Sequence, residues 1–484
     1  MRVGLPLSGL FLAWILGLTA AHAQPARSTA PPALPNAATY AAIRDRALGS
    51  TWAFERLADL TDLIGPRMSG SPQAQAAIEQ VAAVMRAEGL TVTLQPMRAP
   101  HWVRGEERAE LVEYAKRPQG ITQKLQLTAL GGSVATPPSG ITAQVLVVRS
   151  FAELTARAKD ARGRIVLFDV SFDQDLAEGG HAGQAYGQAV LYRVLGASAA
   201  AKVGALAALI RSVGGASYRL PHTGQMLYEP GAPQIPTAAL SAEDAALVAR
   251  LDKRGPVSMK LVLTPQTLPD VDSFNVIGDL AGSSKPEELV LLSGHLDSWD
   301  LATGALDDGA GVAAALGVVH VLRELKLRPK RSLRVVAYMS EEVGAVGGKA
   351  YFEAYKGKLA QHVAAIESDS GAGKPLGIAA YTSDASFEAL KLLRDVLAPL
   401  GATALERAAR PIGADISPLE AAGVPGFEPL LDGRRYFDYH HTPADTLDKV
   451  DPRNLQRMVA TLGVLSYFLA ETPEPPARVP ALTQ

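Results

Sequence analysis

Short apolar runs recur in the C-terminal half of the chain, and polar residues follow each of them. Three runs, at residues 289–292, 333–338 and 363–366, have the length and composition of buried strands. Residues 309–327 carry apolar side chains at helical spacing, which predicts an amphipathic helix. Strand-like and helix-like runs alternate from 270 to 470. This pattern predicts an α/β fold in which helices flank a mostly parallel central sheet.

The first quarter of the chain predicts helices and then strands. Residues 40–90 have the pattern of helices that break at Gly65-Pro66, and Ser71-Pro72 opens a further helix. Residues 91–130 alternate between apolar and polar side chains, which predicts strands. We assign residues 38–124 to the first part of a main domain.

The composition changes between residues 125 and 265. Short strand-like runs at 144–148 and 164–168 mix with Gly-rich loops, and an Ala-rich helix is predicted near 196–210. These features predict a separate inserted domain that is rich in β-structure. The main domain would then resume at residues 266–470.

Both ends of the chain are predicted to lie outside these domains. Arg2, a mostly apolar run at 5–20 and small residues before Gln24 have the form of an export signal at 1–23. An uncleaved membrane anchor is the alternative, but the run is short for a span. A Pro/Ala-rich linker would follow at 24–37, and four prolines within 471–484 predict a disordered tail. We therefore expect an exported protein, periplasmic or secreted, with no membrane span after signal removal.

Composition limits the kinds of binding partner and of metal ligand that this protein can have. The 484 residues carry a net charge of −2, so nothing favours nucleic acid or an anionic membrane as a partner. The chain contains no cysteine, so an exported protein of this sequence has no disulfides. Any metal site must therefore use His, Asp and Glu ligands.

Acidic and imidazole side chains follow the three predicted strands. His295 and Asp297 come after the first, Glu341 and Glu342 after the second, and Asp369 after the third. Ligands bind outside the carboxyl ends of the strands in open α/β sheets. Three adjacent strands could therefore deliver these side chains to one crevice.

Two further groups complete the pattern. Asp307-Asp308 stand just before the predicted amphipathic helix, and His440-His441 lie in a loop that contains a proline. Two zinc ions about 3.5–4 Å apart can together activate a water and polarise a carbonyl. Each ion needs about three protein ligands, and a separate carboxylate must stay off the metal to move a proton. The pattern predicts a two-metal hydrolase site.

Five motifs resemble, in the same order, those of the M28 family of zinc metallopeptidases. They are Gly-His-Leu-Asp-Ser at 294–298, Asp-Asp-Gly-Ala-Gly at 307–311, Ser-Glu-Glu-Val-Gly at 340–344, Glu-Ser-Asp-Ser-Gly at 367–371 and His-His-Thr-Pro-Ala-Asp-Thr at 440–446. The likeness spans roughly residues 40–470. It implies a zinc exopeptidase fold interrupted by a protease-associated domain, which would be the predicted insertion.

The resemblance also implies a set of zinc ligands. His295 and Asp369 would bind one zinc, Glu342 and His441 the other, and Asp307 would bridge the two ions. The family's ligand directly precedes Thr or Ser in the last motif. This favours His441 as the ligand and leaves its neighbour His440 with a packing or supporting role.

Further roles follow from the resemblance or from position in the sequence. Glu341 would be the general base, and Asp297 would orient the first histidine, His295. His222, in the predicted insertion, and Tyr436, just before the histidine pair, are candidate substrate contacts.

The function implied is hydrolysis of dipeptides or short peptides with a free amino terminus, by a dizinc enzyme that forms a homodimer. A general aminopeptidase that acts on longer peptides is the nearest alternative. From another class, a glutaminyl cyclase of this fold keeps one zinc, and a receptor-type relative would have lost ligands or Glu341. The complete ligand set disfavours both.

Overall fold

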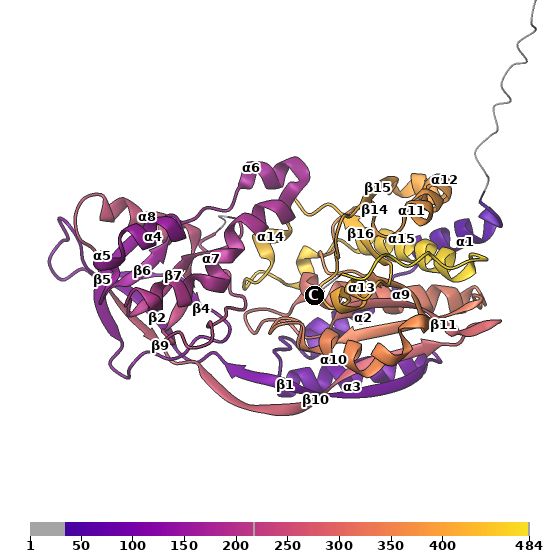
Figure 1. Cartoon of the computed structure of the whole chain (residues 1–484), viewed down its shortest axis with the longest axis horizontal. Coiled ribbons are helices and arrows are strands. Elements are labelled where there is room, and N and C mark those ends of the chain that lie inside the picture. The colour runs from indigo at the N-terminus through magenta and orange to yellow at the C-terminus, as the bar shows by residue number, and fades with distance from the viewer. Residues whose placement is uncertain (1–33, 216–217, 483–484) are drawn as a thin grey trace, which may run out of the picture. The chain divides into compact units, whose positions relative to one another are not determined.

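The computed structural model describes residues 34–215 and 218–482 (Figure 1). The residues discussed below belong to one compact unit that begins at Asn36. The predicted export signal and most of the predicted linker lie outside the described residues.

The first sheet carries the three strands that the apolar runs predict. Its strand order is β1 (Thr91–Val103), β10 (Gln266–Leu280), β12 (Arg331–Tyr338), β11 (Lys285–His295), β13 (His362–Glu367), β16 (Gly426–Leu431), β14 (Pro375–Tyr381) and β15 (Ala404–Arg407).

The central strands β12, β11, β13 and β16 are parallel, but β10 and β14 pair antiparallel with their inner neighbours. The expected mostly parallel sheet is therefore a mixed sheet with a parallel centre. Helical crossovers join β11 to β12 and β12 to β13, as parallel neighbours require.

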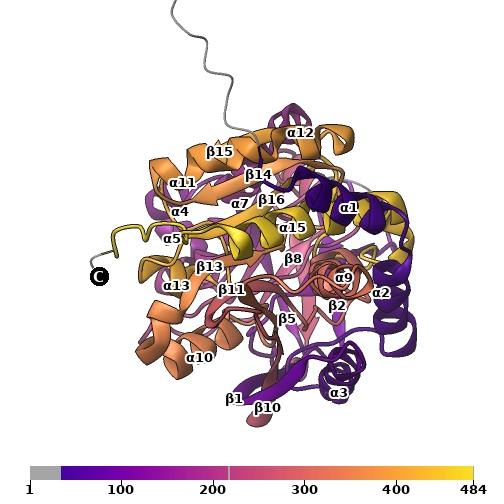
Figure 2. The same cartoon turned by 90° about the vertical axis from the view of Figure 1, so that its right-hand side faces the viewer.

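Helices cover both faces of this sheet (Figure 2). One face carries α9 (Ala310–Glu324) and α15 (Pro452–Glu471), with α1 (Ala37–Leu48) and α2 (Trp52–Leu63) packed on them. On the other face, α10 (Val346–Tyr355) and α13 (Ser417–Ala421) pack through Tyr351 and Leu419 onto the sheet. Helix α3 (Pro72–Ala87) lies against β1 and β10.

Helix α9 is the core helix of the sheet. The segment Ala305–Glu324 is long and apolar enough to cross a membrane, yet 94% of its most apolar stretch is buried inside the protein. The sequence predicted an amphipathic helix here. In the structure almost the whole surface of α9 is covered by the sheet, α15, α1 and α2, which accounts for its apolar character on all sides.

A second sheet is formed by the segments between β1 and β10. Its strand order is β3 (Gln123–Leu125), β2 (Glu107–Glu113), β9 (Ser258–Leu263), β5 (Ile141–Val148), β6 (Ile165–Phe168), β7 (Ala207–Arg211), β8 (Thr237–Leu240) and β4 (Leu127–Ala129). Its principal helices are α7 (Ala182–Lys202) and α8 (Ala242–Asp252). Shorter helices of the chain are α4 (Phe151–Ala156), α5 (Ala158–Ala161), α6 (Gln174–Leu176), α11 (Asp384–Ala389), α12 (Arg394–Leu397) and α14 (Tyr436–Tyr439).

The second sheet begins earlier than the predicted insertion. Strand β2 lies before residue 125, and the chain passes between the sheets after β1 and again before β10. Because β1 and β10 pair antiparallel along their lengths, the outgoing and returning connections lie side by side (Figure 1). The Ala-rich helix predicted near 196–210 is only partly correct, because residues 207–210 belong to β7. Helix α7 ends at Lys202, and Gly204 adopts a left-handed conformation just after it.

The last residues differ from the predicted disordered tail. After α15 the chain lies against the body of the protein, where Val479 N donates to Gly423 O and Leu482 N to Ala421 O. The buried side chain of Arg331 donates from Nη1 to Thr472 O at 2.6 Å. These bonds give partners to backbone N–H and C=O groups of a segment that forms no helix or strand.

The start of α9 packs tightly against the loop after β13. A Cβ atom at Gly311 would lie 2.0 Å from Ser368 O, so no larger residue fits without a shift of the backbone. This close approach brings the N-terminus of α9 and the end of β13 together.

We predict that Gly311→Ala lowers the free energy of unfolding by about 1–3 kcal/mol through overpacking. Gly187→Ala is the matched control, because Gly187 is an exposed position of helix α7 with no atom within 4 Å of its added Cβ. The control should gain about 0.5–1 kcal/mol from better helix propensity. Thermal or denaturant unfolding measures both. Equal stability of the two variants would contradict the tight contact.

Candidate metal centre

The predicted ligand residues meet at the carboxyl ends of the parallel strands. His295 is the last residue of β11, Glu341 and Glu342 follow β12, and Asp369 follows β13. Asp307 lies in the short segment that leads into α9. The register of the sheet, in which His295 pairs with Tyr338, brings these loops to one edge as the strand pattern predicted.

Asp307 faces two different imidazoles. Its Oδ1 atom lies 3.1 Å from His295 Nε2, and its Oδ2 atom lies 3.2 Å from His441 Nε2. Asp369 Oδ1 is 3.4 Å from His295 Nε2, and Glu342 Oε2 is 3.0 Å from His441 Nε2. The five residues thus form two groups of three that share the carboxylate of Asp307.

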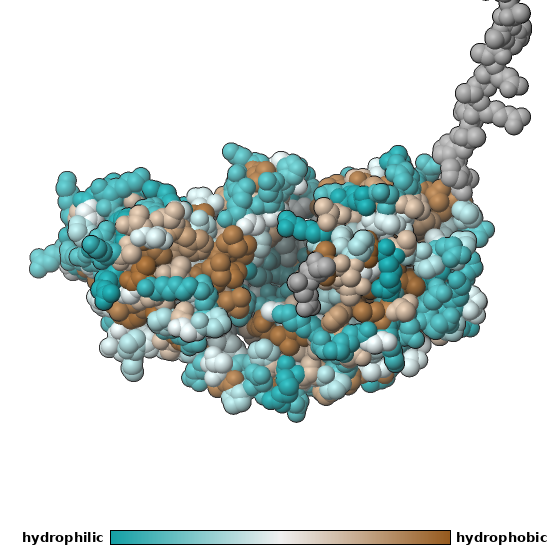
Figure 3. All heavy atoms as spheres, viewed as in Figure 1, coloured by the Kyte–Doolittle hydropathy of each residue, from teal (hydrophilic) through white to brown (hydrophobic). Residues whose placement is uncertain are grey.

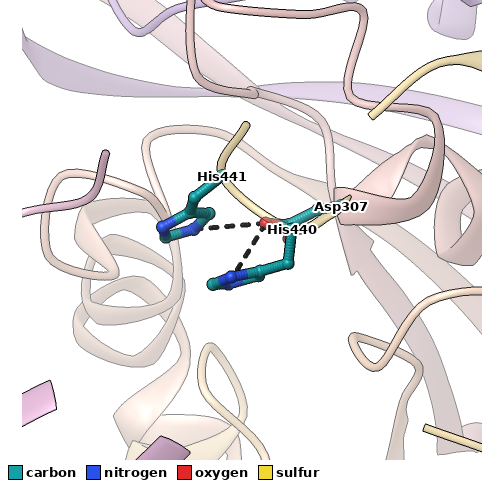
Figure 4. A group of neighbouring side chains, drawn as sticks. All are labelled: Asp307, His440 and His441. Carbon is teal, nitrogen blue, oxygen red and sulfur yellow. Dashed lines mark ion pairs between the residues drawn. The ribbon is translucent and has the colours of Figure 1, made fainter. Parts of the chain in front are cut away.

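The adjacent histidine His440 also reaches this carboxylate. Its Nε2 lies 3.5 Å from Asp307 Oδ2, and its ring stacks on His441 with centroids 3.5 Å apart (Figure 4). Only His441 of the pair also contacts a second predicted ligand, Glu342. The geometry favours His441 over His440 as the ligand.

The two histidines are oriented by backbone carbonyl groups. His295 Nδ1 lies 3.0 Å from Asp297 O, and His441 Nδ1 lies 3.2 Å from Thr223 O. A backbone carbonyl only accepts, so each Nδ1 is a donor. The other ring nitrogen of each histidine, Nε2, faces Asp307.

Unsatisfied oxygen atoms support a cation at the same place. Within the described residues, Asp307 Oδ2 and Glu342 Oε1 are buried without a hydrogen-bond partner. The contact of His441 with Asp307 is not aligned as a hydrogen bond. Buried carboxylates gathered without donors are unfavourable unless a cation neutralises them. Imidazole and carboxylate form a donor set suited to zinc, so the residues present fit the metal that the sequence motifs imply.

Charge and burial shift the pKa values of these groups in different directions. Burial raises the pKa of Glu342 to about 6, against the opposing charge of His441. Burial raises the pKa of Glu341 well above its usual range; His295 opposes the shift, while Asp369 adds to it. Burial alone would also raise the pKa of Asp307. His440, His295 and His441 outweigh this effect and hold the pKa of Asp307 well below its normal value.

Asp297 fixes the backbone that carries the glutamate pair. Its carboxylate accepts the N–H of Glu341 at 3.0 Å and of Glu342 at 3.3 Å. The sequence predicted that this carboxylate orients His295, but its Oδ1 lies 3.8 Å from His295 Nδ1. The backbone carbonyl of Asp297 holds the imidazole instead, because it lies closer to the ring nitrogen.

Three further residues hold the ligand loops, and sequence reasoning gave them no role. Asp445 accepts the N–H groups of Leu306 at 2.6 Å and Asp307 at 3.2 Å. Asp308 accepts the N–H of His295 at 3.1 Å. Buried Arg67 donates to Leu296 O at 2.7 Å and to Gly304 O at 3.0 Å. Asp308 and Asp445 stand inside the quoted motifs, whereas no motif marks Arg67.

A cavity of about 340 Å³ opens beside the ligands. Figure 3 shows a hydrophilic hollow on this face near α14. The cavity is lined by Tyr186, Arg193, Gln225, Asp307, Glu341, Glu342, Gly344, Asp369, Tyr436, Phe437, His440 and His441.

The two predicted substrate contacts occupy different places. Tyr436, from α14, lines the cavity, and burial raises the pKa of its hydroxyl well above the usual range. His222 is not in the lining; it is 1% exposed, its backbone N donates to Ser212 Oγ, and burial lowers its pKa to about 3. The structure therefore places His222 in the packing around the site and away from the cavity surface.

The chain is similar to known peptidases. The model of peptidase family M28 matches residues 275–465. Carboxypeptidase Q of Bos taurus is 40% identical over 424 residues, which cover 87% of this chain and 86% of that protein. Carboxypeptidase Q of Homo sapiens is 40% identical over 444 residues, covering 91% and 89%.

Solved structures give the same result. The Peptidase M28 precursor from Shewanella amazonensis has a TM-score of 0.86 and 36% identity, covering 92% of this chain and 99% of that one. BSAP, a zinc aminopeptidase from Bacillus subtilis, shares the fold with a TM-score of 0.63 at 20% identity, covering 87% and 96%. The chain therefore belongs to peptidase family M28, the family of zinc metallopeptidases whose motifs its sequence carries.

Proposed function

We propose that this protein hydrolyses the peptide bond of dipeptides and other short peptides with a free amino terminus, using two zinc ions per chain. The observation that carries the proposal is the shared carboxylate of Asp307, which faces His295 with one oxygen and His441 with the other. Membership of family M28 supports a peptidase.

Each ligand has a defined place in this proposal. His295 and Asp369 would hold one zinc, Glu342 and His441 the other, and Asp307 both. When bound, the two ions would supply Lewis-acid polarisation of the scissile carbonyl and an activated water.

Glu341 would move the proton. It lines the cavity beside the ligand groups. Asp369 contacts His295 and Glu342 contacts His441, whereas Glu341 makes neither contact. Its raised pKa suits a carboxylate that takes a proton from the attacking water and returns it to the leaving amine nitrogen. Asp297 would act as a positioning residue by holding the N–H of Glu341.

The size of the cavity supports short substrates. Its volume of about 340 Å³ is near the lower end of the range for small-molecule sites. An aminopeptidase that trims longer peptides is the second candidate, since BSAP has this fold and is a zinc aminopeptidase. The complete ligand set disfavours a glutaminyl cyclase or a receptor-type protein.

We extend the proposal to the rest of the chain. The region of the second sheet would be a protease-associated domain, the protein would be exported to the periplasm or outside the cell, and it would form a homodimer. These features rest on the sequence and its resemblance to family M28.

The first prediction concerns the metal. Purified protein should contain about two zinc ions per chain by elemental analysis, because the two ligand groups share one carboxylate. A chelator should abolish hydrolysis, and added zinc should restore it. One zinc per chain at saturation, together with full activity, would contradict the dinuclear site.

The second prediction separates the two adjacent glutamates. Glu341→Gln should retain both zinc ions and lose about 10²–10⁴-fold in kcat, because only proton transfer is removed. Glu342→Gln is the matched control and should weaken zinc binding at one site. The assigned roles are wrong if both variants lose metal equally, or if Glu341→Gln remains active.

The third prediction concerns substrate length and the free amine. Dipeptides with both ends free should give the highest kcat/KM, N-acetylated dipeptides should be poor, and decapeptides should be slow. A panel of such peptides, analysed by mass spectrometry, measures this order. Equal cleavage of N-blocked peptides would falsify the exopeptidase orientation, whereas efficient stepwise trimming of decapeptides would favour the aminopeptidase.

A further inference from the structure

A buried guanidinium lines the cavity without an acidic partner. Arg193 lies on helix α7 and is 7% exposed. Within residues 34–215 and 218–482, Arg193 makes no ion pair with a carboxylate. Its Nη1 atom donates to Thr223 O at 3.5 Å, and its Nε atom has no hydrogen-bond partner. A buried cation of this kind is unfavourable unless an anion joins it. Arginine stays charged at any physiological pH, so the anion has to come from elsewhere.

The surroundings hold the guanidinium in one position. Arg193 Cζ lies 5.5 Å from the centre of the Tyr186 ring. A Cβ atom at Gly224 would lie 2.4 Å from Arg193 Nη1, so the glycine lets the loop backbone pass close to the guanidinium. The next residue, Gln225, also lines the cavity and leaves its buried Oε1 without a partner. The group is fixed in place before any ligand arrives.

Arg193 lies one imidazole ring away from the ligand atoms. Its Nη1 is 3.4 Å from His441 Nδ1, while the opposite nitrogen of that ring, Nε2, faces Glu342 and Asp307. A carbonyl polarised beside Nε2 would therefore have a cation a short distance along the cavity. In a dipeptide, the α-carboxylate belongs to the residue that follows the scissile bond, about 3.8 Å of chain further on.

We propose that Arg193 binds the free α-carboxylate of the substrate, so that the cavity selects peptides that end one residue after the scissile bond. This inference rests on the proposed peptidase function. An arginine fork matches a carboxylate with two parallel hydrogen bonds. A longer peptide or a peptide amide presents an uncharged amide at this position and leaves the guanidinium without an anion.

The test compares dialanine with dialanine amide in zinc-loaded enzyme. The wild type should prefer dialanine, and Arg193→Gln should lower kcat/KM for dialanine by about a hundredfold while changing that for the amide little. Arg193→Lys should recover part of the loss, because it restores the charge without the fork. Zinc content should be unchanged in both variants.

Lys202→Gln serves as the control, since Lys202 lies on the same helix with 51% of its side chain exposed and pairs with Glu229. It should behave as the wild type on both peptides. Equal losses on both peptides in Arg193→Gln, or loss of zinc, would show that Arg193 only supports His441 and would overturn the inference. A wild type that cleaves both peptides equally well would also overturn it. If the wild type cleaves neither, the proposed function itself fails and the inference falls with it.

Discussion

The position of one carboxylate, that of Asp307, determines the geometry of the whole centre. Its oxygens lie 3.1 Å from His295 and 3.2 Å from His441, so residues 146 positions apart meet across one side chain. Several buried acids must converge for this, and each would repel the others in a medium of low dielectric. The arrangement is tenable because a cation is expected between them and because backbone N–H groups hold the supporting acids.

The supporting acids act as caps for the ligand loops. Asp297 holds the N–H groups of the glutamate pair, Asp445 holds those of Leu306 and Asp307, and Asp308 holds that of His295. Arg67 donates hydrogen bonds to two loop carbonyls, those of Leu296 and Gly304. Side chains on irregular backbone are placed accurately only when such bonds fix the backbone, since loops lack a regular hydrogen-bond ladder.

The segments of the second sheet supply part of the site. Thr223 O, in the loop after β7, accepts from His441 Nδ1, and Arg193 and Tyr186 of α7 line the cavity. The chain enters the second sheet after β1 and returns to the first sheet through β10. Because β1 and β10 are paired, the two connections between the sheets lie next to each other. Residues that follow strands of the first sheet and residues from the segments of the second sheet therefore line one cavity.

The sequence by itself determined the central strands, the α9 helix and the set of five ligand-type residues, because buried runs and the polar residues that follow them are local patterns. It could not determine that Asp297 holds the glutamate backbone, that His222 is buried away from the cavity, or that Arg67 and Arg193 belong to the site. These facts depend on contacts between residues 44 or more positions apart, or on the facing direction of a side chain. Only the packing of the complete chain decides them, because local sequence patterns carry no information about which distant backbone groups will meet.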